Sequence, residues 1–231
     1  MIKLALVWCA PTTVDSHDSW IAVTVRAERL LAAAEAWQPC GASGYPVLTS
    51  AVSLFGVRAG VVCRLDQHEV GRRDALGLDA ITDRHVLDGL MGLPAGIPVS
   101  VDALTERQRR LFRRVPEGMI EFDGDQLVRR AVPPLTVGFA LVPARDWHAG
   151  LVQAGRYAPF CARAMLLPEP PVDLQDATMQ AGYYGIGIGV ITAGVLRVLV
   201  EPEPYVRRRH SSAQWWVNEE IYRVATAAAT V

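Results

Sequence analysis

The sequence predicts an α/β (α+β) fold, with a small mixed sheet and packed helices in the C-terminal half and a helix–hairpin region before it. Apolar residues make up 51% of the 231 positions, which is enough to fill a sizeable core. Strand and helix patterns alternate after Pro134, as is typical of a mixed sheet covered by helices. Upstream of Pro133, a helix-capping sequence is followed by a turn sequence typical of a hairpin.

The best internal boundary is Pro133-Pro134, because two consecutive prolines resist both helix formation and ladder pairing. We therefore expect two parts, residues 1–132 and residues 135–231. A second proline-rich stretch, residues 168–171, is expected to be a loop inside the second part.

The first 65 residues contain two elements that can be predicted and one stretch that cannot. Ile2 to Trp8 has the pattern of a first strand. Arg26 to Trp37 is rich in Ala and Leu and predicts a helix that ends before Pro39 and Gly41. Residues 45–65 mix β-branched residues with glycine, and their pattern favours neither structure.

The middle of the chain predicts a helix, a second helix and a hairpin. Thr82 or Asp83 can cap a short helix through Leu90. Residues 105–108, Thr-Glu-Arg-Gln, have the form of a capping box, which predicts a helix to about Arg114. Residues 119–130 then form two short strands around the turn Asp-Gly-Asp at 123–125.

The second part predicts an alternation of strands and helices. The expected strands are 135–142, 161–167, 184–191 and 195–200, and the expected helices are 145–157, 174–183 and about 211–225. Glycines at 185, 187 and 189 alternate along one of these strands. They are explained most simply by packing beneath a helix, since no helix follows them as a dinucleotide site would require.

The helix after Thr105 is strongly basic, and its apolar residues supply a buried side. Its arginines are Arg107, Arg109, Arg110, Arg113 and Arg114. A helix followed by a hairpin resembles a winged-helix unit over about residues 70–130. In that fold the second helix enters the major groove of duplex DNA and the hairpin touches the backbone. The alternative interpretation is a solvated basic helix, and four acids on the hairpin segment, Glu117, Glu121, Asp123 and Asp125, would repel phosphate.

Residues 135–205 resemble the core of PD-(D/E)xK nuclease-like proteins. The resemblance rests on Asp146-Trp147 with the following helix, on the strand at 163–167, and on the phrases at 184–188 and 198–202. In that family, the strand before the Asp-Trp helix carries Glu-x-Lys. The acid holds Mg²⁺ and the lysine orients the attacking water.

This sequence departs from that pattern at the residues that would bind the metal. The Glu-x-Lys positions fall on Leu141, Val142 and Pro143, and residues 136–142 contain no acid. The resemblance therefore implies a nuclease-like domain without its metal site. The alternative is a Mg²⁺-dependent nuclease with displaced acids, for which Asp123 and Asp125 are the candidates.

Two further clusters could bind a partner. Arg207, Arg208, Arg209 and His210 form the densest basic cluster, and they precede a helix that Ser211 or Ser212 can cap. The positive end of that helix would help to hold an anion. Because adjacent tryptophans cannot both face one core, Trp215/Trp216 predict a contact with a second subunit or a protein partner.

A third function class is a small-molecule enzyme of specialised metabolism. His68, Arg72 and His85, with Glu69 and Asp88, could converge as an acid–base pocket. Their spacing does not force them together. No nucleophile elbow, Walker loop or zinc-protease motif occurs in the sequence.

The amino-acid composition of the chain restricts which of these function classes fit it. The net charge is −1, which argues against a surface that binds nucleic acid everywhere. Lys3 is the only lysine among 23 basic residues, an arginine bias typical of a GC-rich genome. The four cysteines are irregularly spaced and predict neither a disulfide scaffold nor a metal site. No apolar stretch is long enough to span a bilayer and no secretory signal is evident, so we expect a cytoplasmic protein without a membrane partner.

The favoured interpretation is a non-catalytic, DNA-associated regulatory or antitoxin-like protein. It would join a winged-helix-like region to an inactivated nuclease-like domain, with no cofactor, no metal and duplex DNA as a possible partner. Its nucleic-acid-binding residues would be Arg107, Arg109, Arg110, Arg113, Arg114, Arg207, Arg208 and Arg209.

Overall fold

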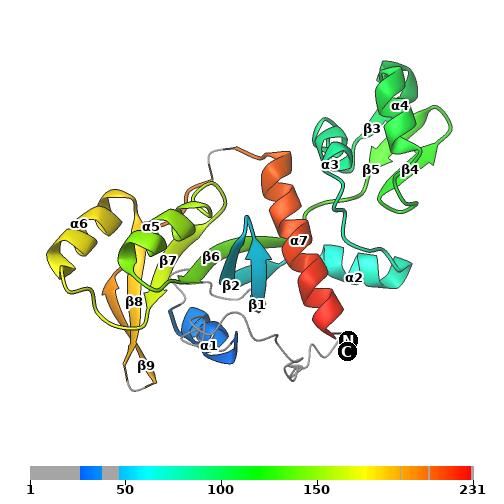
Figure 1. The fold of residues 1–231 in the computed structure, drawn as a ribbon. Coiled ribbons are helices and arrows are strands. Elements are labelled where there is room, and N and C mark those ends of the chain that lie inside the picture. Colours follow the sequence, from blue (N-terminus) through cyan, green and yellow to red (C-terminus); the bar gives the residue numbers. More distant parts are fainter. Residues whose placement is uncertain (1–26, 38–46, 193, 208, 230–231) are drawn as a thin grey trace, which may run out of the picture. The chain divides into compact units, whose positions relative to one another are not determined.

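The computed structural model describes residues 27–37, 47–192, 194–207 and 209–229. These residues form helices together with a six-stranded mixed sheet and a three-stranded sheet (Figure 1). The predicted α/β class is therefore confirmed, whereas the strand expected at residues 2–8 lies outside the described residues. None of the described helices has the length and apolar character needed to cross a membrane.

The chain divides into two compact units. Unit 1 contains the described residues up to Arg64, residues 137–207 and those from Val224, whereas unit 2 contains residues 65–136 and 208–223. This division differs from the expected parts 1–132 and 135–231. The physical reason is that strands on both sides of Pro133 belong to one sheet, so most of unit 2 is a segment inserted between two neighbouring strands.

Unit 1 is built on the six-stranded sheet. Its strands, in spatial order, are β1 (Val47–Leu54), β2 (Val57–Leu65), β6 (Leu135–Pro143), β7 (Ala162–Leu167), β8 (Ile186–Thr192) and β9 (Val195–Val200). β6, β7 and β8 run parallel, while β1–β2 and β8–β9 are antiparallel hairpins. The parallel strands are buried along nearly their whole length, which explains their continuous apolar sequences.

Helices cover both faces of this sheet. α5 (Trp147–Gly155) and α6 (Leu174–Tyr183) make the two crossovers between parallel strands, close to the predicted helices 145–157 and 174–183. α1 (Ala27–Trp37) packs on the other face, where Trp37 shares a core with Phe139 and Leu141 of β6.

The alternating glycines of β8 make room for α1. A Cβ atom built on Gly189 would lie 2.6 Å from the ring of Trp37, and one built on Gly187 would lie 3.0 Å from it. The interpretation of these glycines as packing positions beneath a helix is confirmed. Gly185 is different, because it has a φ of +63° and lies against Glu203.

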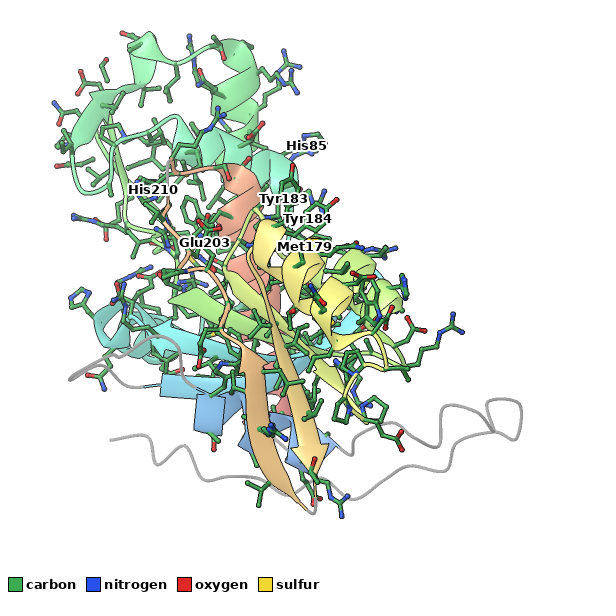
Figure 2. All side chains as sticks on the ribbon, turned by 90° about the vertical axis from the view of Figure 1, so that its left-hand side faces the viewer. His85, Met179, Tyr183, Tyr184, Glu203 and His210 are labelled. Carbon is green, nitrogen blue, oxygen red and sulfur yellow. The ribbon has the colours of Figure 1, made fainter. Side chains whose placement is uncertain are left out.

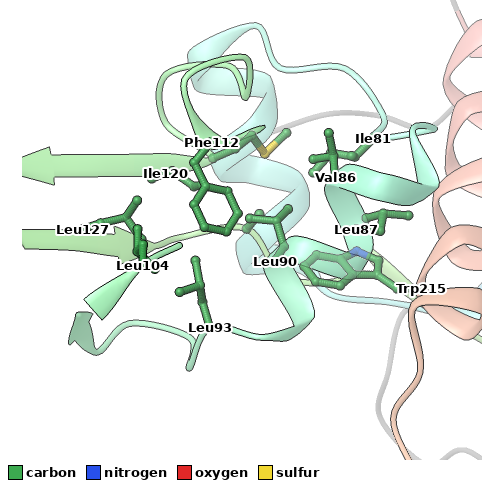
Figure 3. Packing of buried hydrophobic residues seen from close by; sticks show 12 residues of the cluster. Ile81, Val86, Leu87, Leu90, Leu93, Leu104, Phe112, Ile120, Leu127 and Trp215 are labelled. Atoms are coloured by element: carbon green, nitrogen blue, oxygen red, sulfur yellow. The ribbon is translucent and has the colours of Figure 1, made fainter. Parts of the chain in front are cut away.

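Unit 2 contains short elements around its own core. They are α2 (Gln67–Leu76), α3 (Arg84–Met91), β3 (Pro98–Ser100), α4 (Glu106–Phe112), β4 (Ile120–Asp123), β5 (Gln126–Arg129) and the first part of α7 (Ser212–Ala229). Figure 3 shows Phe112, Leu90 and Trp215 packed together in this core. Trp215 thus comes from about 100 residues further along the chain than Phe112.

α2 has no counterpart among the predicted elements. It begins after Asp66, whose carboxylate accepts a 3.0 Å hydrogen bond from the amide of Glu69, and it ends at Gly77 in the left-handed conformation. The buried residues of this helix are Glu69 and Arg73. Hydrophobic periodicity cannot detect a helix whose buried side chains are charged.

Candidate nucleic-acid interface

The basic helix of unit 2 lies within a helix, strand, helix and hairpin arrangement. α3 contacts α4, β3 follows α3, and β5 is the central strand between β3 and β4. The β4–β5 hairpin turns at Gly124, which has a φ of +59°. The predicted hairpin is confirmed. β3 was not predicted, because a strand of three residues has too short a sequence pattern to be recognised.

α4 is held in place at both of its ends. The amide of Thr105 donates to the Gln108 side chain at 2.9 Å, and the amide of Gln108 donates to the Thr105 hydroxyl at 3.3 Å. This reciprocal pair confirms the predicted capping box. At the other end, Phe112 is 1% exposed and anchors the helix in the core (Figure 3).

The arginines of this segment are mostly exposed, and within residues 105–115 they outnumber the acids five to one. Arg107, Arg113 and Arg114 are exposed, and no carboxylate in the described part of the chain pairs with them. Arg110 forms an exposed 3.2 Å ion pair with Glu106, the one acid in the segment 105–115. The resulting surface has a local excess of positive charge, which attracts phosphate groups.

Arg109 has a different role from its neighbours. Its Nε donates a 3.2 Å hydrogen bond to the backbone carbonyl of Leu104, and the residue is partly buried. It therefore helps to hold the turn that precedes α4. We expect it to contribute less to a ligand contact than the three exposed arginines.

The β4–β5 hairpin carries the opposite charge at its tip. Asp123 and Asp125 flank the turn and are both exposed, and Glu121 pairs with Arg130 at 2.7 Å. The hairpin is anchored by Arg129, whose guanidinium donates a 3.1 Å bond to the carbonyl of Leu90. Burial lowers the pKa of Arg129 from its usual value. The acidic tip and the basic helix therefore present two surfaces of opposite sign.

The second basic cluster lies where unit 1 ends and unit 2 resumes along the chain. Arg207 is the last residue of its unit 1 segment and Arg209 belongs to unit 2, while Arg208 lies outside the described residues. The expected cap of the next helix is present, since the Ser211 hydroxyl accepts a 3.2 Å hydrogen bond from the amide of Gln214. An anion site at this helix remains a prediction.

The acid–base pocket expected around the histidines is not formed. His68 and His85 lie on different helices and are both exposed, as Figure 2 shows for His85. Glu69 is buried and bound to two arginines, and Asp88 accepts a 2.6 Å hydrogen bond from the Ser212 hydroxyl. The acids are engaged in structural contacts and the histidines face solvent, so these residues do not converge.

Both C-terminal tryptophans contact the core of their own unit. Trp215 is 2% exposed, and Trp216 packs partly against the same cluster beneath the guanidinium of Arg84, which lies 4.0 Å from the ring centroid. Trp215 thus lies inside the cluster and Trp216 at its edge. A contact of this pair with a second subunit or a protein partner stays a prediction.

A buried ionic network lies behind these elements, and sequence reasoning missed most of it. Arg73 is fully buried, and its guanidinium contacts Glu219 at 2.7 Å and Glu69 at 2.7 Å. Glu219 also accepts hydrogen bonds from the amide of Ile81 and the indole of Trp215. Desolvation works against the charged form of Arg73, yet these two carboxylates raise its pKa overall. Partners 146 residues apart leave no local signal.

Unit 1 contains the strand whose residues were aligned with Glu-x-Lys. In β6, Leu141 is 0% exposed and lies in the core formed with α1. Among the described residues, no group of three His, Cys, Asp or Glu side chains could hold a metal ion.

The outer side of α5 has a shallow hollow of about 600 Å³, lined by Arg145, His148 and Arg156 among others.

Comparison of the chain with protein-family models, with curated proteins and with solved structures finds no match in any of the three. The site itself combines a capped, core-anchored helix with exposed guanidinium groups that lack a described carboxylate partner.

Proposed function

We propose that this chain is a non-catalytic, DNA-associated protein of a regulatory or antitoxin-like kind, and that α4 contacts the phosphates of duplex DNA. One observation carries the proposal: the segment 105–115 holds five arginines against one glutamate, and three of those arginines are exposed without a described carboxylate partner. Guanidinium groups form charge-assisted, often bidentate, hydrogen bonds with phosphate.

The order of elements in unit 2 supports this proposal. α4 follows α2 and α3 along the chain and directly precedes the β4–β5 hairpin, which is the helix-and-hairpin order on which the resemblance to a winged-helix unit rests. In that fold the helix of this pair enters the major groove, and here it is the basic helix. Its anchoring by Phe112 and the capping box would present the arginines on a rigid support.

The acidic hairpin limits how DNA can approach. Asp123 and Asp125 would repel phosphate, so the hairpin tip would point away from the backbone. We therefore propose that this unit binds DNA mainly through its helix, unlike a winged-helix unit whose hairpin touches the backbone. Such a short contact would give weak, strongly salt-dependent binding.

The non-catalytic part of the proposal rests on β6. A metal-dependent nuclease needs hard oxygen ligands at its reacting centre. The β6 sequence from Leu135 to Pro143 contains no carboxylate, and Leu141 is packed into the core instead. Unit 1 would then be a nuclease-like scaffold that no longer cuts, and a DNA-associated role would place the protein in the cytoplasm.

A binding assay with charge-matched variants tests the DNA contact. The triple variant R107A/R113A/R114A should weaken binding to a labelled duplex by a factor on the order of 10 to 100 in a fluorescence anisotropy titration. The control R58A/R197A removes two exposed arginines of unit 1 and should bind like the wild type. Equal affinities for all three proteins would refute the proposal.

A cleavage assay separates the alternative nuclease function. Wild-type protein incubated with supercoiled DNA and Mg²⁺ or Mn²⁺ should leave the DNA intact. Metal-dependent nicking that disappears in D123N/D125N would instead support a nuclease with displaced acids.

A further inference from the structure

α6 has an unusual distribution of side chains for a helix packed on a sheet. Its buried residues are the small Ala177 and Ala181, whereas Met179 and Tyr183 are 65% and 83% exposed. Tyr184, directly after the helix, is 53% exposed, and its ring stands at 84° to that of Tyr183 with 5.0 Å between centroids. Figure 2 shows Met179, Tyr183 and Tyr184 together on the outer side of this helix.

These residues form one continuous stripe. Asp176, Met179 and Tyr183 are spaced three and four residues apart within α6, which places them along one side of the helix. Val172 lies in the turn that precedes α6. Val172 is fully exposed. Met179, Tyr183 and Tyr184 are thus large side chains that are all exposed and lie close together, and exposed groups of this kind mark interaction sites. A standard protein interface buries about 800 Å² per partner, so this stripe can form the centre of one.

The stripe contains one charged residue, and its position favours a particular occupant. An apolar partner surface would leave the carboxylate of Asp176 without a hydrogen bond, at a considerable cost. If α6 packs antiparallel on a second α6, with the two-fold axis near the peptide after Met179, residue 176 of one copy lies opposite residue 183 of the other. The hydroxyl of Tyr183 can then donate to the carboxylate of Asp176, twice in the interface.

We propose that a second copy of this chain covers the α6 stripe, forming a two-fold dimer in which Asp176 of each copy accepts a hydrogen bond from Tyr183 of the other. A Cβ atom built on Gly182 meets no other atom within 4 Å, so no part of the described chain covers α6 at this residue. The dimer rests on α6 alone and does not depend on DNA binding by α4.

Sedimentation equilibrium of the full chain at several concentrations tests the dimer and its geometry. Wild-type protein should self-associate as a dimer. The variants Y183E and Y183K both remove the exposed ring and differ in the sign of the charge that they introduce. The difference between their dimer dissociation constants therefore measures the effect of that charge on Asp176 of the other copy. Y183E should raise the dimer dissociation constant at least about tenfold above that of Y183K, because a like-charge pair and an attractive pair each occur twice.

Two further variants complete the test. V206E places a charge on an exposed valine of unit 1 that is not part of the α6 stripe and should dimerise like the wild type. The double variant D176K/Y183K should dissociate like Y183E, since it restores like charges across the axis. A wild-type chain that stays monomeric at all concentrations would overturn the proposal, and so would equal dissociation constants for Y183E and Y183K.

Discussion

At the scale of single residues, the structure depends on charged side chains that are fully removed from water. Arg73 and Glu219 are each 0% exposed, and Glu219 satisfies a guanidinium, an indole and a backbone amide at once. Such a network stabilises the fold only while every partner is present, since a buried charge without its counter-ion is costly.

Removing the Glu219 carboxylate should therefore strongly destabilise unit 2. We expect E219A to lower the free energy of unfolding by about 3–5 kcal/mol in urea denaturation. E121A breaks a 2.7 Å pair with Arg130, in which both side chains are about half exposed, and should cost at most about 1 kcal/mol. Similar losses for the two variants would show that the network does not hold this unit together.

A second residue-scale prediction concerns pH. Asp146 caps α5, and the hydrogen bond from the amide of Ala149, helped by Arg145, holds its pKa below the ordinary value of 3.8. Because the pKa of Asp146 is lower in the folded state, its ionised carboxylate stabilises the fold at any pH above the ordinary pKa. This stabilisation is lost as the pH falls through the folded-state pKa. D146A should cost about 0.5–2 kcal/mol at pH 7 and clearly less at pH 3.

Urea denaturation at the two pH values measures this change. E169A, which removes an exposed loop acid from the same unit, serves as the control and should show no comparable pH-dependent cost. A cost of D146A that is equal at pH 7 and pH 3 would contradict a charge-assisted cap.

At the scale of elements, local signals predicted much of the fold. α6 was expected at residues 174–183 and occupies those residues, and the capping box placed the start of α4. The β1–β2 hairpin escaped prediction because its turn is Phe55-Gly56, with Phe55 at a φ of +57°. That turn is supported by tertiary contacts, since the Phe55 ring stacks on Phe160 at 5.2 Å between centroids. No local sequence pattern predicts a contact between residues so far apart in the chain.

The glycines of β8 lead to an element-scale prediction. G189A should destabilise unit 1 by about 1–3 kcal/mol, because the added methyl group meets the rigid ring of Trp37. G155A adds a methyl group where no atom lies within 4 Å and should be neutral or slightly stabilising. In the double-mutant cycle with W37A, the cost of G189A should largely disappear. A cost that persists without the indole ring would mean that the clash lies elsewhere.

At the scale of the whole molecule, the sequence could not indicate how the chain divides. Pro133-Pro134 lies near one point at which the chain passes from unit 2 to unit 1. However, β1 and β2, which precede these prolines in the sequence, belong to the same sheet as β6, which follows them. α7 likewise places Trp215 in the core of unit 2 from near the end of the chain. Long-range pairings of this kind are set by tertiary packing and carry no local signature. The arginines around α4 could be predicted as candidates for binding phosphate because they lie close together in the sequence. The separation of His68 and His85 could not be predicted, because it depends on how two helices pack.

We propose that the exposed arginines around α4 neutralise DNA phosphates, and the salt dependence of binding measures this neutralisation directly. Each neutralised phosphate contributes about 0.9 to the slope of log Kobs against log salt concentration, so R107A/R113A/R114A should flatten the wild-type slope by about 2.7. R58A/R197A should leave the slope unchanged. A triple variant with the same salt slope as the wild type would contradict the account.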